Sequence, residues 1–289
     1  MTKKISQLIL CLLFVIILPS CSTDKTEKGD KPQVYTSFYA MYDFAKQIAQ
    51  DKADVYMLCP TGQEPHDFEP TAKDIANLSD ADVFIYNGMG MEHWADSVIG
   101  TLEGSDVICV NTSDAAEDIT EENDPHLWLN PENAYKQLEA ITNALKSADE
   151  KNALYYDSRL SELKEKLDTL TDDYTAAINT FTSRDIVVSH KAYGNLCRAF
   201  SLNQIAINGI SSSDDPSPMQ MTEIEKYITE NNIKYIFKEP LGSSSVVDAI
   251  ANDTGCGVLV LDPFEGNTQN KDYFTVMYEN LDSLRTALK

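Results

Sequence analysis

Three of the four histidines in this 289-residue sequence lie at or shortly after the end of a strand-like run. His66 follows ADVYML through a short loop, His126 follows DVICV through an acidic loop, and His190 ends DIVVSH directly. A carboxylate, Asp262, ends a further run, GVLVLD. Ligands of open α/β sheets bind beyond the carboxyl ends of the strands. The placement therefore predicts one site made of three imidazoles and a carboxylate.

This donor set favours a borderline divalent cation. Three neutral imidazoles and one carboxylate give the mixed nitrogen and oxygen coordination that suits tetrahedral zinc. Magnesium and calcium prefer sites made only of oxygen ligands, and manganese would favour a second carboxylate in place of one imidazole. A single loop histidine is more often a surface or capping residue, but three at equivalent positions favour a shared metal. The fourth histidine of the sequence, His93 in NGMGMEHWADS, begins a helix after a glycine-rich turn, and we expect it to be structural or exposed.

The elements that would position these residues alternate between strands and helices. Strand-like runs in the first half are QVYTSF, ADVYML, DVFIYN and DVICV, and those in the second half are DIVVS, QIAIN, KYIFK and VLVLD. A charged segment between them has leucines at helical spacing and no glycine or proline, which predicts a long helix. After His126, Asn130 is a good N-cap and Pro131 suits the first helical position. This organisation predicts two Rossmann-like α/β lobes with parallel sheets: an N-terminal lobe (33–146), a linking helix (147–181) and a C-terminal lobe (182–289).

The N-terminus has the features of a lipoprotein signal. MTKK is a positive region, LILCLLFVIIL is an apolar run too short to span a bilayer, and LPSC follows it. We expect residues 1–20 to be a signal peptide, Cys21 to be lipid-modified, and the polar residues 21–32 to form a flexible tether. An ordinary cleaved signal with Cys21 as a bystander is the alternative. Lipidation would anchor the protein to the outer side of the cell membrane.

Charge and cysteine content narrow the function further. The 46 acidic residues outnumber the 23 basic ones and give a formal net charge of −23, which argues against nucleic acid or an anionic membrane surface as a partner. Four cysteines remain beyond the signal and Cys21, and their wide spacing without a CxxC does not resemble a zinc cluster. The sequence leaves their oxidation state open: Cys59, Cys109, Cys197 and Cys256.

Several motifs resemble those of the zinc- and manganese-binding solute receptors of bacterial ABC transporters, the ZnuA/TroA-like lipoproteins. They are GQEPHDFEPTAKDIANLSDADVFIYNGMGMEHW, NDPHLWLNP, VVSHKAYGNL, SSSDDPSPMQM and VLVLDPFEGNT, in this order over nearly all of the mature chain. The resemblance implies two α/β lobes joined by a long rigid helix, with the metal between the lobes. It also implies a monomer that delivers its metal to the membrane permease of an ABC importer.

The same resemblance assigns the metal ligands. It identifies His66 and His126 as the first two ligands and His190 as the third, a position where a glutamate marks manganese members. The fourth ligand is usually an acid at the end of the last strand, which matches Asp262, although water takes this place in some zinc members. This chain lacks the histidine-rich loop that many zinc members carry. Three acids are candidates for orienting the imidazoles, with loop turns and helix caps as the alternative: Asp124, Asp215 and Glu239.

The sequence therefore predicts an extracytoplasmic receptor, rather than an enzyme, that carries Zn(II) as its transported ligand. A manganese or iron receptor is the nearest alternative. A zinc hydrolase would need an open coordination position and a general base, for which Asp262 is available, but the sequence has no HExxH and no nucleophile elbow. A surface adhesin is a further alternative that no residue pattern supports directly.

Overall fold

The computed structural model describes residues 30–116, 124–211, 216–266 and 269–289. The predicted signal peptide, Cys21, most of the tether and Asp215 lie outside these ranges. Residues 31–289 form one compact unit. Within the described ranges, no helix combines the length and the apolar character that a membrane crossing requires. Cys59, Cys109, Cys197 and Cys256 are free thiols.

The first half of this unit is an α/β lobe around a parallel sheet with the order β2-β1-β3-β4. Its strands are short and carry the apolar runs expected from the sequence: β1 (Gln33–Thr36), β2 (Asp54–Met57), β3 (Val83–Tyr86) and β4 (Ile108–Asn111). The helices are α1 (Tyr39–Ala49), α2 (Ala72–Ser79), α3 (Ala95–Leu102) and α4 (Pro131–Ala148). The first three lie between strands along the chain, and α4 follows the last strand.

The second half repeats this plan with a parallel sheet of the order β6-β5-β7-β8. Its strands are β5 (Asp185–Val188), β6 (Asn203–Ala206), β7 (Tyr235–Lys238) and β8 (Gly257–Val260). Its helices are α6 (Gly194–Phe200), α7 (Pro218–Glu230), α8 (Ser245–Thr254) and α9 (Tyr273–Leu288). The described residues before α5 also contain short 3-10 turns: η1 (Pro65–Asp67), η2 (Thr112–Ala115), η3 (Leu127–Leu129) and η4 (Glu150–Asn152). The predicted fold class is confirmed.

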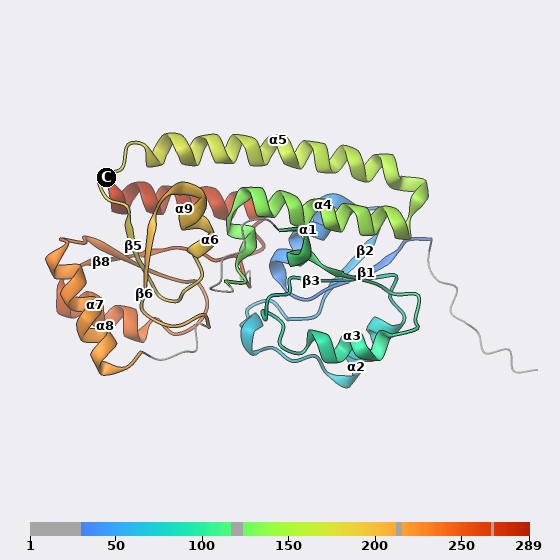
Figure 1. Cartoon of the computed structure of the whole chain (residues 1–289), viewed down its shortest axis with the longest axis horizontal. Helices are drawn as coiled ribbons and strands as arrows, with labels where there is room; N and C mark the ends of the chain where they lie inside the picture. The colour runs from blue at the N-terminus through green and yellow to red at the C-terminus, as the bar shows by residue number, and fades with distance from the viewer. Residues whose placement is uncertain (1–29, 117–123, 212–215, 267–268) are drawn as a thin grey trace, which may run out of the picture. The chain divides into compact units, whose positions relative to one another are not determined.

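The long helix between the lobes is α5 (Ala153–Ile178), which packs against α4 of the first lobe and α9 of the second (Figure 1). Leu163, Leu167 and Leu170 form its buried stripe. The predicted segment 147–181 is not one helix, because α4 runs to Ala148 and the turn η4 separates it from α5. Asp149 fixes this turn by accepting hydrogen bonds from Tyr156 Oη (2.8 Å) and Asn152 Nδ2 (2.6 Å).

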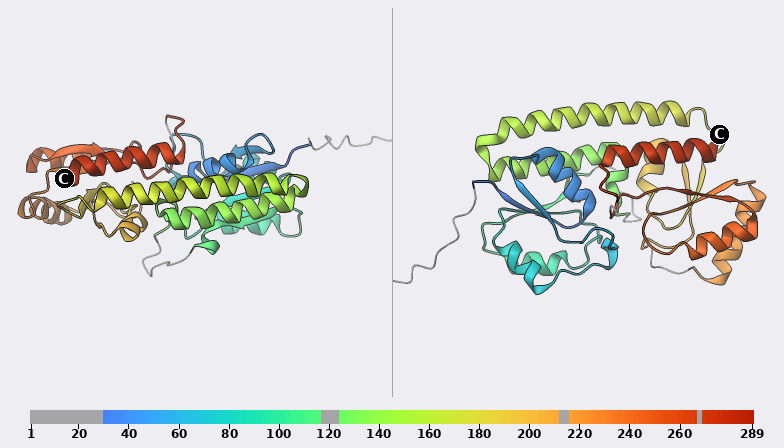
Figure 2. Two further views of the ribbon diagram at one scale, coloured as in Figure 1. Left: turned by 90° about the horizontal axis from the view of Figure 1, so that it is seen from above. Right: turned by 180° about the vertical axis from the view of Figure 1, so that it is seen from behind.

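The two lobes are joined by buried hydrogen bonds as well as by α5, and they lie side by side along it (Figure 2). Trp128 of the first lobe donates from Nε1 to the Pro263 carbonyl of the second lobe at 2.7 Å. Tyr273 Oη in turn donates to the Trp128 carbonyl at 2.8 Å. Both side chains are almost fully buried, so these bonds are shielded from competing water. They fix the loop after β8 against the loop before α4.

Candidate metal site

The three predicted histidines meet at the carboxyl ends of the strands, as sheet topology requires. His66 lies in η1 after β2, where the Glu64 carboxylate accepts a hydrogen bond from its backbone N–H and Pro65 takes the first position. His126 is the residue before η3, and His190 follows β5 by two residues. The N-cap predicted for the next helix is confirmed, since α4 starts at Pro131 and the Asn130 side chain accepts from the Glu132 N–H at 2.9 Å.

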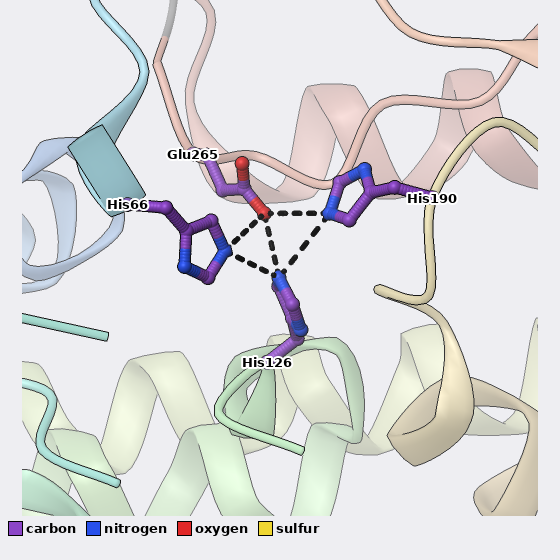
Figure 3. A group of neighbouring side chains, drawn as sticks. All are labelled: His66, His126, His190 and Glu265. Atoms are coloured by element: carbon purple, nitrogen blue, oxygen red, sulfur yellow. Dashed lines mark hydrogen bonds and ion pairs between the residues drawn. The ribbon is translucent and has the colours of Figure 1, made fainter. Parts of the chain in front are cut away.

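A fourth side chain, Glu265, completes the group (Figure 3). The Nε2 atom of His126 lies 3.3 Å from Nε2 of His66 and 3.4 Å from Nε2 of His190. Glu265 Oε1 lies 2.8 Å from His126 Nε2, 3.4 Å from His190 Nε2 and 3.9 Å from His66 Nε2. All four atoms fall within 4.8 Å of one another.

Two of these separations match the edges of a tetrahedron around zinc. Zn–N bonds of about 2.0–2.1 Å place the nitrogens of a regular tetrahedron about 3.3–3.4 Å apart. The separations of His126 Nε2 from the Nε2 atoms of His66 and His190, 3.3 and 3.4 Å, have this length. Glu265 Oε1 is buried and makes no hydrogen bond of good geometry, although three ring nitrogens surround it. A buried carboxylate oxygen in this setting needs a cation, and the donor set fits zinc.

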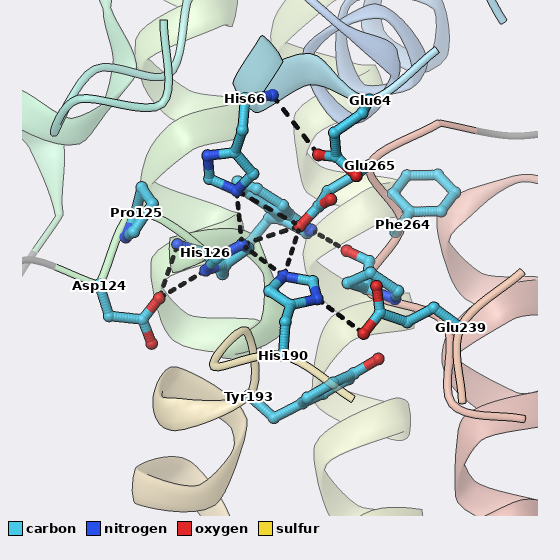
Figure 4. Close-up of polar contacts among 12 residues, drawn as sticks. Glu64, His66, Asp124, Pro125, His126, His190, Tyr193, Glu239, Phe264 and Glu265 are labelled. Carbon is cyan, nitrogen blue, oxygen red and sulfur yellow. Dashed lines mark hydrogen bonds and ion pairs between the residues drawn. The ribbon is translucent and has the colours of Figure 1, made fainter. Parts of the chain in front are cut away.

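Two further carboxylates orient the imidazoles from behind (Figure 4). Asp124 Oδ1 lies 2.6 Å from His126 Nδ1 and accepts from the His126 backbone N–H at 3.1 Å. Glu239 Oε1 lies 2.6 Å from His190 Nδ1 and also accepts from the Ser189 hydroxyl. A carboxylate on Nδ1 fixes the tautomer that leaves the Nε2 lone pair free for a metal. Both rings therefore present Nε2 to the centre of the group.

Burial and charge act in opposite directions on these groups. Burial lowers the pKa of His66 to about 4. For His126, burial also acts to lower the pKa, but the neighbouring carboxylates Asp124 and Glu265 outweigh it and raise the pKa to about 9. The pKa of His190 is raised well above its ordinary value, because the charges of Glu239 and Glu265 outweigh burial. Burial favours a protonated Glu265, but the neighbouring imidazoles hold its pKa well below the usual range.

Asp262, predicted as the fourth ligand, lies outside the group of four. Its Oδ1 accepts a hydrogen bond from the Phe264 backbone N–H at 2.8 Å. Burial raises its pKa to about 6. The sequence reasoning missed Glu265 because it considered only the residue that ends the strand. The signal was present in the motif LDPFEGNT, where a second acid follows three residues later.

His93, expected to be structural or exposed, lies apart from the group of four. Its side chain is 49% exposed, and its Nε2 lies 3.3 Å from Glu69 Oε1. Of the acids predicted to orient the imidazoles, Asp124 and Glu239 contact His126 and His190, while Asp215 is outside the described residues.

The chain is similar in sequence and in structure to several known proteins. Residues 34–287 match the family model of the periplasmic zinc-uptake complex component A, ZnuA. The chain is 35% identical to the high-affinity zinc uptake system protein ZnuA of Bacillus subtilis (strain 168), over 100% of this chain and 99% of that protein. It is 33% identical to the zinc-binding lipoprotein AdcA of Streptococcus pneumoniae (strain ATCC BAA-255 / R6), covering 98% of this chain and 60% of AdcA. The crystal structure of the Zn(II)-bound ZnuA-like domain of Streptococcus pneumoniae AdcA superposes with a TM-score of 0.79 at 31% identity, covering 89% of this chain and 99% of the domain.

Proposed function

The chain belongs to the ZnuA family of zinc-binding receptors of zinc uptake systems, and from this premise we propose how it binds its cargo. One Zn(II) is held between the two lobes by the Nε2 atoms of His66, His126 and His190 and by Oε1 of Glu265. Asp124 and Glu239 orient two of the imidazoles through Nδ1. The ion is the transported substrate and takes part in no reaction on the protein.

The observation that carries this proposal is the convergence of four donor atoms within 4.8 Å of one another. Two of the nitrogen separations have the length of a tetrahedral edge around zinc, and the one oxygen among the donors is buried without a hydrogen bond. A pocket that only held water would not require this arrangement of three imidazole nitrogens and one carboxylate oxygen. Three nitrogens and one oxygen also favour zinc over manganese, which is a harder ion. The manganese or iron alternative is therefore less favoured.

The direct test compares Glu265→Ala with Asp262→Asn by competition titration with zinc and manganese. The wild type should bind one zinc per chain and prefer zinc to manganese. The alanine variant should bind zinc at least about 10-fold more weakly, because even the loss of a residue that only orients a metal ligand weakens binding by about that factor. An unchanged affinity in the alanine variant, or equal preference for manganese, would contradict the proposed ligand set.

The partner and the anchor are the second part of the proposal. Members of this family work with ABC importer permeases in zinc uptake, and we propose that this chain delivers zinc to such a permease as a monomer held by lipid on Cys21. The lipobox-like LPSC and the lipoprotein name of the pneumococcal relative support the anchor. Metabolic labelling with palmitate should mark the wild type but not Cys21→Ala, which should instead appear in the culture supernatant. Labelling of the variant would contradict the anchor.

We propose no catalytic role for the site. Coordination by four side chains leaves no open position for the water that a zinc hydrolase activates. Turnover assays of the zinc-loaded protein with ester and peptide substrates test this point, and hydrolysis above that of a Glu265→Ala variant would contradict it.

A further inference from the structure

The Asp262 carboxylate closes a small turn beneath the metal ligand Glu265. Asp262 ends the run that begins with β8, and its Oδ1 accepts from the backbone N–H of Phe264, two residues later, at 2.8 Å. An aspartate that bonds to the backbone two residues ahead replaces one backbone link of a turn with its own side chain. The turn delivers Glu265, whose side chain is 2% exposed, to the three imidazoles.

The residue held by this bond has an unfavourable backbone conformation. Phe264 has φ of +62°, in the left-handed region that a bulky side chain rarely adopts. Its ring is buried edge-on against Tyr39 and Tyr273, with centroid distances of 5.3 and 5.7 Å. Strained residues of this kind persist only where their surroundings over-determine them, and they cluster at functional sites. The hydrogen bond from Asp262 is one of the contacts that hold this conformation.

Other residues fix the remainder of the turn, so the Asp262 side chain holds only the backbone N–H of Phe264. Asn280 of α9 clamps the Asp262 backbone, accepting from its N–H at 2.8 Å and donating to its carbonyl at 2.8 Å. Trp128 Nε1 fixes the next carbonyl, that of Pro263, at 2.7 Å. The backbone N–H of Phe264, directly before the ligand, is bonded by the Asp262 side chain (Figure 4 shows Phe264 beside Glu265).

We propose that Asp262 is a positioning residue for zinc binding, which holds Phe264 in its left-handed conformation and thereby aims the Glu265 carboxylate at the three histidines. This inference rests on the proposed function, in which Glu265 is the fourth ligand. Asp262 itself does not contact the metal. Without its hydrogen bond, the turn relaxes toward an ordinary backbone conformation, and the carboxylate is displaced from the site.

An alanine and asparagine pair tests the role of the acceptor oxygen. Asp262→Ala removes the acceptor and should weaken zinc binding by about 10- to 100-fold, the range for residues that orient metal ligands. Asp262→Asn keeps an oxygen at the same position and should stay within about fivefold of the wild type. If Asp262 bound the metal through its charge, asparagine would lose as much affinity as alanine, and that result would overturn the inference.

A double-mutant cycle shows whether Asp262 acts through Glu265. Once Glu265→Ala has removed the carboxylate, adding Asp262→Ala should cost no further zinc affinity, because a positioning residue has nothing left to position. Additive losses would overturn the inference. A loss in Glu265→Ala with none in Asp262→Ala would also overturn it, while leaving the proposed ligand set intact. An unchanged affinity in Glu265→Ala would overturn the ligand set, and this inference with it.

Cobalt absorption and a matched control separate positioning from general destabilisation. Visible absorption of Co(II)-loaded protein reports the ligands, so Asp262→Ala should change the spectrum as Glu265→Ala does, and Asp262→Asn should not. Asp272 is the control, because its Oδ1 accepts from the Thr275 N–H at 2.8 Å as the cap of α9. Asp272→Ala should lower the unfolding temperature and leave zinc affinity and the cobalt spectrum unchanged. A spectral change in this control equal to that of Asp262→Ala would overturn the inference.

A second substitution keeps the test decisive if Asp262→Ala does not fold. Asp262→Gln retains a polar side chain, but its oxygen lies one bond farther from the backbone and misses the Phe264 N–H. It should lose zinc affinity by about 10-fold or more, with the same change in the cobalt spectrum. Wild-type affinity in this variant would overturn the inference.

Discussion

Zinc binding should release about two protons from the protein at pH 7. Burial acts to lower the pKa of His126, but neighbouring carboxylates raise it to about 9, and the pKa of His190 is likewise raised well above its ordinary value. The raised pKa values favour a proton on both imidazoles at pH 7 in the metal-free site. The pKa of His66 is lowered by burial to about 4, so this ring is already neutral. Zinc needs all three rings neutral at Nε2 and must displace both protons.

The size of the effect follows from linkage between metal and proton binding. The logarithm of the apparent zinc affinity changes by one for each displaced proton per pH unit, so two protons give about 100-fold, or about 2.8 kcal/mol, between pH 7 and 8. The sign follows from the raised pKa values: protons compete with zinc up to a higher pH than for an ordinary imidazole, and zinc affinity climbs with pH until His126 loses its proton near pH 9. Three ordinary imidazoles with a pKa of about 6.5 would together release only about 0.7 proton at pH 7.

Isothermal titration in two buffers of different ionisation enthalpy measures the number of protons directly. Asp124→Asn is the matched change, because an amide in place of the carboxylate removes the charge that holds the proton on His126. This variant should release about one proton fewer than the wild type. Release of less than about one proton by the wild type, with no change in the variant, would refute the reasoning from the carboxylates.

Two further predictions concern single side chains. The variants H66A, H126A and H190A, each lacking one proposed ligand, should weaken zinc binding by at least about 10- to 100-fold. Alanine at the exposed His93 should change zinc affinity by less than about twofold. Titration against a competing chelator measures both effects, and a loss in H93A equal to that in H126A would contradict the site. Burial raises the pKa of Asp43, which accepts from the Tyr273 N–H, to about 7, so its contribution to stability is present at low pH and is lost as pH rises from about 4 through about 7. Asp43→Asn should remove the fall in unfolding free energy between about pH 4 and about pH 7 and stabilise the protein at pH 8 by roughly 1–4 kcal/mol. Urea unfolding of both proteins at pH 5 and pH 8 measures this, and the same pH dependence in the variant as in the wild type would contradict the role of the carboxyl.

The sequence was sufficient to predict the two parallel sheets and the meeting of the three histidines, because both depend on local patterns. A strand of a parallel sheet is a short apolar run, and a polar residue at its carboxyl end falls at the edge where ligands bind. His190 follows this rule directly, since it lies two residues after β5. His66 and His126 follow it through loops whose proline and asparagine signals are also local, such as the cap at Asn130.

The proposed fourth ligand, Glu265, escaped the same reasoning because it lies past the end of the strand, beyond a turn that the strand pattern does not reveal. A phenylalanine gives no sign that its backbone is left-handed, as a glycine at that position would. Phe264 also contacts the rings of Tyr39 and Tyr273, and Tyr39 lies more than two hundred residues away in sequence. The break between α4 and α5 escaped for a similar reason, since the turn at Asp149 depends on Tyr156 and contains no glycine or proline.

The three carboxylates around the imidazoles make the metal exchange neutral in charge. Asp124, Glu239 and Glu265 place three carboxylates in a buried volume, and protons on His126 and His190 would offset two negative charges in the empty site. Zn(II) brings the same two positive charges when it displaces those protons. The buried charge is therefore identical in the loaded and the empty receptor. A permease that distinguishes the two forms would then have to recognise something other than the net charge of the site, such as the positions of the loops that carry the ligands.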